Sequence, residues 1–365
     1  MDQNTNLINN FVLPLKLNHI SFETNQKNQL TTKIQEAVSN SFNEYFQQCS
    51  NHDEYRPKTG ECLSQFGFSA TVFESLEVLY ILDLKKEFQK AKNFIMKTFS
   101  LNQAEWINRR EFWSRCIGSL LSTYILTSDS FFLMKAIEYS NSILQISITA
   151  PYVNVESKKY RNLEWIEGTS LTDIVAGLPE LFTLSKLTNN ESYSLKYLTI
   201  LNNIPTFSNN SIFNFYNLET KKPIFDFSSF GNNIIDFFHI LSIAYSIKPM
   251  KSLKEILSNF LNYIQMDENQ YCVYSRYSSL FDTISIIDKN NIKIQNFENF
   301  SNFLNVVNYF LENQKDFFES NCSYNYYLPF RFDASLLRAF IRSSNEPSEK
   351  VESKVLNFIK DSRPY

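Results

Sequence analysis

The feature that most constrains the fold is an internal repeat. Each copy consists of an apolar helix, a short polar break, and a second helix whose apolar residues recur at three- and four-residue spacing. Two copies share one frame, because Tyr80 and Phe88 match Tyr124 and Phe132, which are eight residues apart in both. The five copies cover residues 79–95, 123–144, 181–201, 243–264 and 339–359.

The short breaks predict antiparallel helical hairpins. TSDS, LTNN and SSNEPSE contain helix N-cap residues and are too short to join anything but neighbouring antiparallel helices. Such hairpins bury their apolar faces only by stacking on one another. The first helices, as in residues 117–126 and 234–245, are apolar nearly all round, while the second helices have a polar face. Two such layers predict an all-α fold, an α/α toroid (barrel), with an open solenoid of hairpins as the alternative.

Composition agrees with long helices and excludes some functions. The 365 residues include 34 Phe and 20 Tyr but only 6 Gly, which argues against tight β-hairpins and Gly-rich phosphate loops. Because 35 Lys and Arg nearly balance 38 Asp and Glu, no field steers nucleic acid or anionic membranes to the chain. Five scattered cysteines without a CxxC spacing indicate mostly free thiols, with one disulfide pair left open. We expect no signal peptide and no transmembrane segment.

Carboxylates at the starts of the predicted first helices are the remaining candidates for chemistry. Three histidines (among them His239, predicted as a core or lumen residue) give no metal or nucleophile motif. Each carboxylate has a simpler explanation, since acidic residues stabilise helix N-termini through the macrodipole. As a set on one rim, they could perform acid/base chemistry. The set comprises Glu111, Asp173, Glu180, Asp236 and Asp333, with Arg115 one helical turn after Glu111 and Arg331 beside Asp333.

Three segments resemble glycoside hydrolase family 47, the class I α-1,2-mannosidases and the mannosidase-like proteins of ER-associated degradation. They are SNHDEYRPKTG, FGFSATVFESLEVLYILDLKKEF and REFWSRCIGSLLSTYILTSDSFFLMKA, and EGTSLTDIVAGLPELFTLSKLTNN resembles the family's next block. The resemblance implies an (α/α)7 barrel, here expected to lack its last hairpin. We expect an N-terminal extension at residues 1–28 and a single barrel domain at residues 29–365.

The resemblance also implies roles for single residues. Glu111 matches the proton-donating Glu of the family, and Arg115 matches an Arg that contacts sugar hydroxyls. Glu180 and Asp173 match further substrate-binding acids. The second catalytic acid is expected at Asp333, which together with Arg331 matches the family's R-P-E-T, or at Asp236, one residue beyond the family's Asp.

The family binds Ca²⁺ through a threonine in its last hairpin, and no residue of this sequence matches that threonine. The resemblance therefore implies calcium, while the sequence names no metal ligand. The family's second-half disulfide also has no matching cysteines here.

The function implied by the resemblance is inverting hydrolysis of terminal α-1,2-linked mannose on N-linked high-mannose glycans. The expected partner is a high-mannose glycan or glycoprotein, and the expected location is the secretory pathway, although the absence of a visible signal leaves the cytoplasm open. Two alternatives remain: an inactive relative that binds mannose glycans or glycoproteins, and a helical scaffold whose acids are caps. The sequence does not set the oligomeric state.

Overall fold

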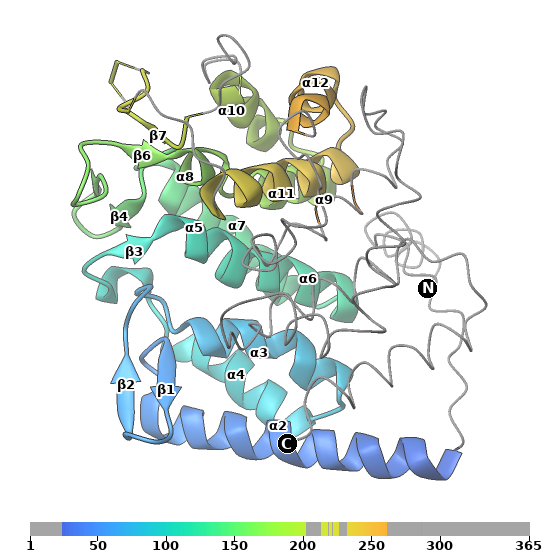
Figure 1. Ribbon diagram of the computed structural model, residues 1–365. Helices are drawn as coiled ribbons and strands as arrows, with labels where there is room; N and C mark the ends of the chain where they lie inside the picture. Colours follow the sequence, from blue (N-terminus) through green and yellow to red (C-terminus); the bar gives the residue numbers. More distant parts are fainter. Residues whose placement is uncertain are drawn as a thin grey trace, which may run out of the picture. The chain divides into compact units, whose positions relative to one another are not determined.

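The structure is a computed structural model (Figure 1), and it describes residues 24–201, 213–217, 219–220, 222–225, 232–260, 283 and 286. By its contacts the chain divides into two units. Residues 1–11, 22–208 and 213–227 form the first, and residues 12–21, 209–212 and 228–365 the second. Arg331, Asp333 and the predicted hairpin at 339–359 lie outside the described residues. The single barrel domain at residues 29–365 stays a prediction.

Four of the five predicted hairpins are present. In the first unit α3 (Ala70–Ile81) pairs with α4 (Lys85–Lys97), and α6 (Gly118–Thr127) pairs with α7 (Ser130–Leu144). The third pair is α9 (Leu178–Thr188) and α10 (Ser192–Leu201). In the second unit α11 (Asn232–Ile247) pairs with α12 (Lys251–Phe260). The predicted all-α hairpin fold is confirmed, while closure into a toroid stays a prediction.

Within the first unit the hairpins stack through their first helices, as the apolar pattern predicts. Helix α3 packs against α6, and α6 packs against α9 (Figure 1). Phe88 and Phe132, which occupy the same position in two repeats, touch at a ring-centroid distance of 5.8 Å. The matching residues of the repeat therefore build the seam between neighbouring hairpins.

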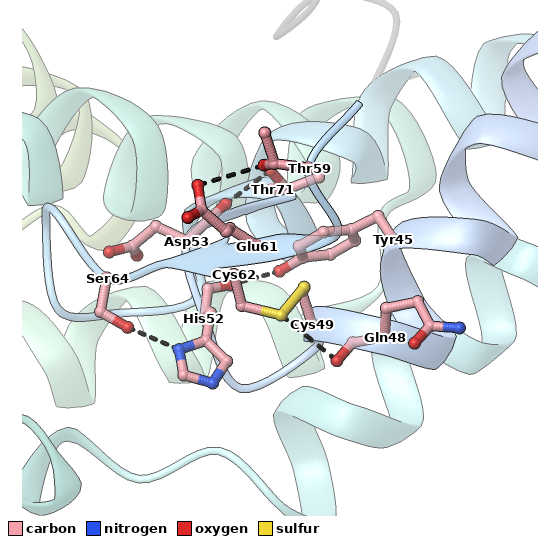
Figure 2. The surroundings of a disulfide bond; sticks show 10 residues. All are labelled: Tyr45, Gln48, Cys49, His52, Asp53, Thr59, Glu61, Cys62, Ser64 and Thr71. Carbon is pink, nitrogen blue, oxygen red and sulfur yellow. Dashed lines mark hydrogen bonds between the residues drawn. A yellow bond between two sulfur atoms is a disulfide. The ribbon is translucent and has the colours of Figure 1, made fainter. Parts of the chain in front are cut away.

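A long helix precedes the hairpins. Helix α2 (Thr24–Cys49) contacts α3, α4 and strand β1 (Glu54–Arg56), and it begins inside the predicted 1–28 extension. Its last residue, Cys49, forms a disulfide with Cys62 (Figure 2). Cys116 is a buried free thiol, and Cys272 and Cys322 lie outside the described residues.

In the described part of the chain three small antiparallel sheets join the helices, so the expectation of no tight β-hairpins was wrong. The strands are β1 with β2 (Glu61–Leu63), then β3 (Ile107–Asn108), β4 (Tyr152–Asn154) and β5 (Lys159–Arg161), and finally β6 (Thr169–Ser170) with β7 (Phe215–Tyr216). Each of the two hairpin loops, at residues 57–60 and 155–158, ends on one residue of positive φ, which a single glycine or a tolerant side chain supplies. Gly60 has φ +74° in the β1–β2 turn, and Lys158 has φ +54° before β5.

The strands position the starts of the first helices. Strand β3 leads directly into α5 (Arg109–Glu111), and β6 leads directly into α8 (Leu171–Val175), which precedes α9. Glu111 and Asp173 therefore each lie in the first helical residues after a short strand. Among the described helices, none is both long and apolar enough to cross a membrane.

Candidate active site

Glu111 lies where a strand becomes a helix. The chain passes from α5 through η2 (Phe112–Ile117), a π-helical segment, into α6. The side chain of Asn108 caps the start, since its Oδ1 accepts the N–H of Glu111 at 3.3 Å. Gly118 N–H bonds the carbonyl of Trp113, five residues earlier, which defines the π geometry. π-Helical turns are rare and occur frequently at functional sites.

The carboxylate of Glu111 is held by arginines. Arg115 Nε donates to Glu111 Oε2 at 2.7 Å, and both side chains are 18% exposed. Arg110 Nη2 lies 3.3 Å from Glu111 Oε1, the other oxygen. The predicted pairing of Glu111 and Arg115 is confirmed, and both carboxylate oxygens have a cationic partner.

Arg115 joins Glu111 to a second carboxylate. Its Nη1 donates to Glu74 Oε1 on α3 at 2.6 Å, and its guanidinium lies 4.8 Å from the ring centroid of Phe66. Burial disfavours the charge of Arg115, but the hydrogen bonds and charges of Glu111 and Glu74 outweigh this and raise its pKa. The arginine is therefore a fixed cation that bridges two first helices.

Glu180 occupies the first turn of α9, as predicted, and lies beside α6. A Cβ built on Gly118 would be 3.7 Å from Glu180 Oε1, so the small residue makes room for the carboxylate. Burial raises the pKa of Glu180 to about 7. Gly118 follows Glu111 by seven residues, which is about 10 Å along a helix axis. Glu180 on α9 can therefore hold a proton near neutral pH, and it approaches α6 at Gly118 rather than at Glu111.

Asp173 lies in the first turn of α8 and bonds to the N-cap residue, Ser170. Ser170 Oγ donates to Asp173 Oδ2 at 2.6 Å and accepts the N–H of Asp173 at 3.1 Å, and Asp173 is only 6% exposed. The two hydrogen bonds of this pair give one free backbone N–H in the first turn of α8 an acceptor and hold the cap in place. The contact of Asp173 with substrate stays a prediction, and the geometry gives the side chain a structural task.

Asp236 belongs to α11 in the second unit, where it is half-buried, and its position relative to Glu111 is not described. His239 on the same helix lies with Nδ1 3.1 Å from Thr283 Oγ1 and is half-buried, in keeping with its predicted place in the core or lumen. With Asp333 and Arg331 outside the described residues, the identity of the second catalytic acid stays a prediction.

Three charged residues carry contacts that the sequence did not single out. Glu74 and Asp53 lie within segments that resemble the family, but the pattern gave neither a role. Arg109 is fully buried and donates to the carbonyls of Ala150 at 2.6 Å and Ala176 at 3.1 Å. No sequence signal distinguishes it from its neighbour Arg110.

Within the described residues, no group of three or more His, Cys, Asp or Glu side chains could hold a metal ion. The calcium that the resemblance implies stays a prediction.

A family model for glycosyl hydrolase family 47 matches residues 37–302. The chain belongs to this family. The match runs through the segment that carries Glu111, Arg115 and Glu180, so these three residues lie in a family 47 domain. The resemblance seen in the sequence is confirmed.

Relatives in family 47 are α-1,2-mannosidases. A mannosyl-oligosaccharide 1,2-alpha-mannosidase of Arabidopsis thaliana is 27% identical over 67% of this chain and 48% of its own length. The human mannosyl-oligosaccharide 1,2-alpha-mannosidase IC is 32% identical over 46% of this chain and 28% of its own. The chain thus spans less than half the length of the curated relatives described here.

Two solved structures share the fold. An α-1,2-mannosidase from Trichoderma reesei superposes with a TM-score of 0.66 at 14% identity, covering 91% of this chain and 84% of that one. A sugar epimerase from a ruminal bacterium superposes with a TM-score of 0.52 at 12% identity, covering 79% of this chain and 87% of that one. Both similarities concern the fold alone.

Proposed function

We propose that this chain is an inverting glycoside hydrolase that removes terminal α-1,2-linked mannose from high-mannose glycans. The observation that carries the proposal is the Glu111–Arg115 pair, in which a half-buried carboxylate is fixed at 2.7 Å at the start of a first helix. The match of residues 37–302 to family 47 and the names of the relatives support it.

Inverting hydrolysis needs an acid that protonates the leaving oxygen and a base that activates water on the opposite face of the sugar. Glu111 is proposed as the acid. Its Oε2 is engaged by Arg115, so Oε1 would carry the proton, directly or through a bound water, once the side chain of Arg110 moves aside. Arg115 then keeps the carboxyl group oriented through the step.

The base is proposed to be Asp333, with Asp236 as the other candidate. In inverting enzymes the two carboxyl groups stand roughly 6.5–9.5 Å apart, which leaves room for the attacking water. Glu180, Asp173 and Arg331 are proposed to bind sugar hydroxyls. A carboxyl group with a pKa of about 7, such as that of Glu180, can both donate and accept a hydrogen bond near neutral pH. No step is assigned to calcium.

A second candidate function, glycan binding without turnover, is favoured by one observation. Both carboxylate oxygens of Glu111 have arginine partners, at 2.7 and 3.3 Å, which favours a sugar-binding carboxylate over one that donates protons. The two functions differ in whether mannose is released.

The deciding experiment is mannose release from a high-mannose N-glycan by the wild type and by Glu111→Gln. We expect release by the wild type and a loss of about 10²- to 10⁴-fold in the variant. The matched control is Glu138→Gln, an exposed carboxylate on α7 that pairs with Lys135. If the wild type binds the glycan but releases no mannose, the function is glycan binding and hydrolysis is excluded. If the wild type neither binds the glycan nor releases mannose, the remaining interpretation is a helical scaffold without a sugar site. A chelator added to the same assay tests the calcium prediction.

The proposed partner is a high-mannose glycoprotein of the secretory pathway. The Cys49–Cys62 disulfide supports this location, because disulfides persist in oxidising compartments and are rare in the cytosol. A relative from Rattus norvegicus, 28% identical over 44% of this chain and 25% of its own length, is named an endoplasmic reticulum mannosidase. Thiol labelling of the protein as isolated from its cells tests the proposal, and labelled Cys49 and Cys62 would contradict it.

A further inference from the structure

Asp53 is a buried carboxylate that the proposed reaction does not use. Its side chain is inaccessible to solvent and accepts four backbone N–H groups. Oδ2 accepts from Phe66 at 2.7 Å and Gly67 at 2.9 Å, and Oδ1 accepts from Phe68 at 3.1 Å and Ala70 at 3.0 Å. The chain before α3 is thus wrapped around one side chain.

The segment that carries Asp53 is itself fixed on several sides. It lies between Cys49 and Cys62, in the ring that the disulfide closes (Figure 2). Tyr45 of α2 donates its hydroxyl to the carbonyl of His52 at 2.6 Å, and Thr71 of α3 donates Oγ1 to the carbonyl of Asp53 at 2.7 Å. Asp53 therefore cannot shift without disturbing α2 or α3.

A short path of contacts runs from Asp53 to Glu111. Phe66, which donates its N–H to Asp53, accepts the N–H of Asn108 at its carbonyl, at 2.9 Å. Asn108 in turn accepts the N–H of Glu111. Three hydrogen bonds therefore join the buried carboxylate to the backbone of the proposed acid.

The ring of Phe66 provides a second connection. It lies 4.8 Å from the guanidinium of Arg115, whose Nε holds the carboxylate of Glu111. A cation stacked on an aromatic ring is attracted by the ring quadrupole and loses conformational freedom. Phe66 thus supports Glu111 both at its backbone, through Asn108, and at its side chain, through Arg115.

We propose that Asp53 is a positioning residue for Glu111, which it orients through Phe66, Asn108 and Arg115. The inference rests on the proposed function for its catalytic consequence, but the geometric relationship is independent of turnover. Asparagine cannot replace Asp53 in this task, because its amide has one acceptor oxygen and one NH₂ group. Two of the four backbone N–H groups would then face a donor.

The test compares Asp53→Asn, Phe66→Leu and Phe66→Tyr with the control Glu61→Gln. Glu61 is an exposed carboxylate in the same disulfide ring, with partners Arg56 and Thr59. The readouts are kcat and KM for mannose release, and the NMR resonance of the Arg115 Nε–H, assigned by its loss in Arg115→Lys. All are measured at a temperature where circular dichroism shows each variant folded.

We expect Asp53→Asn and Phe66→Leu to lower kcat by about tenfold or more with little change in KM, because misplacing a catalytic group costs turnover rather than binding. In both variants the Arg115 resonance should shift or broaden, while Phe66→Tyr and Glu61→Gln retain the wild-type signal and rate. A folded Asp53→Asn with an unchanged resonance would overturn the proposal.

Two further outcomes are also decisive. If the wild type releases no mannose, the proposed function fails, and the Arg115 resonance alone decides whether Asp53 orients Glu111. If Asp53→Asn does not fold, Phe66→Leu tests the step from Phe66 to Arg115. This variant should fold, because the four hydrogen bonds of Asp53 are made by backbone groups that it keeps. An unchanged Arg115 resonance in Phe66→Leu would then overturn the proposal.

Discussion

The indole of Trp113 packs against Gly177 so closely that a Cβ at residue 177 would lie 2.5 Å from the ring. Trp113 is buried in the π-helical segment after Glu111, and Gly177 precedes α9, which carries Glu180. The contact therefore sets the spacing between the helices that present two of the first unit's proposed site carboxylates, Glu111 and Glu180.

Gly177→Ala should destabilise the protein by about 2–4 kcal/mol. The residue has φ +89°, which strains any side chain, and the methyl group would overlap Trp113. Gly60→Ala is the matched control, since Gly60 also has a positive φ (+74°) but open space around its Cβ position. Its cost should be about 1 kcal/mol. Urea unfolding measures both, and equal costs would show that Trp113 does not constrain the helix spacing.

Glu180 should make stability fall as pH rises. Burial raises its pKa from 4.5 to about 7, so the folded state holds a proton that the unfolded state releases. This stability is fully present below about pH 4.5 and is lost as pH rises through about 7. Because the side chain keeps some exposure to solvent, we expect a loss of about 1–2 kcal/mol rather than the full value of the pKa shift. Glu180→Gln should lack this pH dependence of stability between pH 5 and pH 8. Chemical denaturation of both proteins at each pH measures the difference.

Arg115→Lys should cost about 1.5–3 kcal/mol. Arg115 makes hydrogen bonds to two carboxylates, and the single ammonium of lysine cannot reproduce the fork of a guanidinium. Lys135→Gln removes the pair with Glu138, whose carboxylate side chain is 57% exposed, and should cost less than about 0.5 kcal/mol. Thermal and urea unfolding compare the two variants. Similar losses would mean that the bridge between Glu111 and Glu74 contributes no more than a surface pair.

Replacing both Cys49 and Cys62 by serine should destabilise the protein by about 3 kcal/mol. The bond joins residues 13 positions apart, and closing a loop of that length restricts the unfolded chain by roughly this amount. Wild-type protein reduced with dithiothreitol should unfold at the same denaturant concentration as the double variant. A double variant as stable as the oxidised wild type would contradict the expected contribution.

The repeat predicted the hairpins because it records a packing requirement. Phe88 and Phe132 hold the same position in two copies, and they meet in the structure because neighbouring copies bury matching surfaces against each other. The pairing of Glu111 and Arg115 was predictable for a similar local reason, since residues four apart on a helix lie on one face.

The rest of the site depends on contacts between residues distant in sequence. Asp53 bonds N–H groups 13 to 17 positions later, and Glu74 meets Arg115 across 41 positions. Spacing on one helix or strand gives no information about such contacts. Ser170 and Asp173 show the converse, because a capping pair three residues apart was visible in the sequence but resembled a substrate-binding acid just as well.

The π-helical segment sets the direction of Glu111 relative to the hairpin of α6 and α7 that follows it. A π turn holds one residue more than an α turn, so Phe112–Ile117 inserts a single residue between the carboxylate and α6. Deleting the exposed Ser114 would restore regular winding and rotate Glu111, together with the buried Trp113, by about 100° around the axis relative to α6. One residue of helical register thus sets the direction of Glu111 and of the tryptophan that packs against Gly177, so a single-codon deletion would displace both.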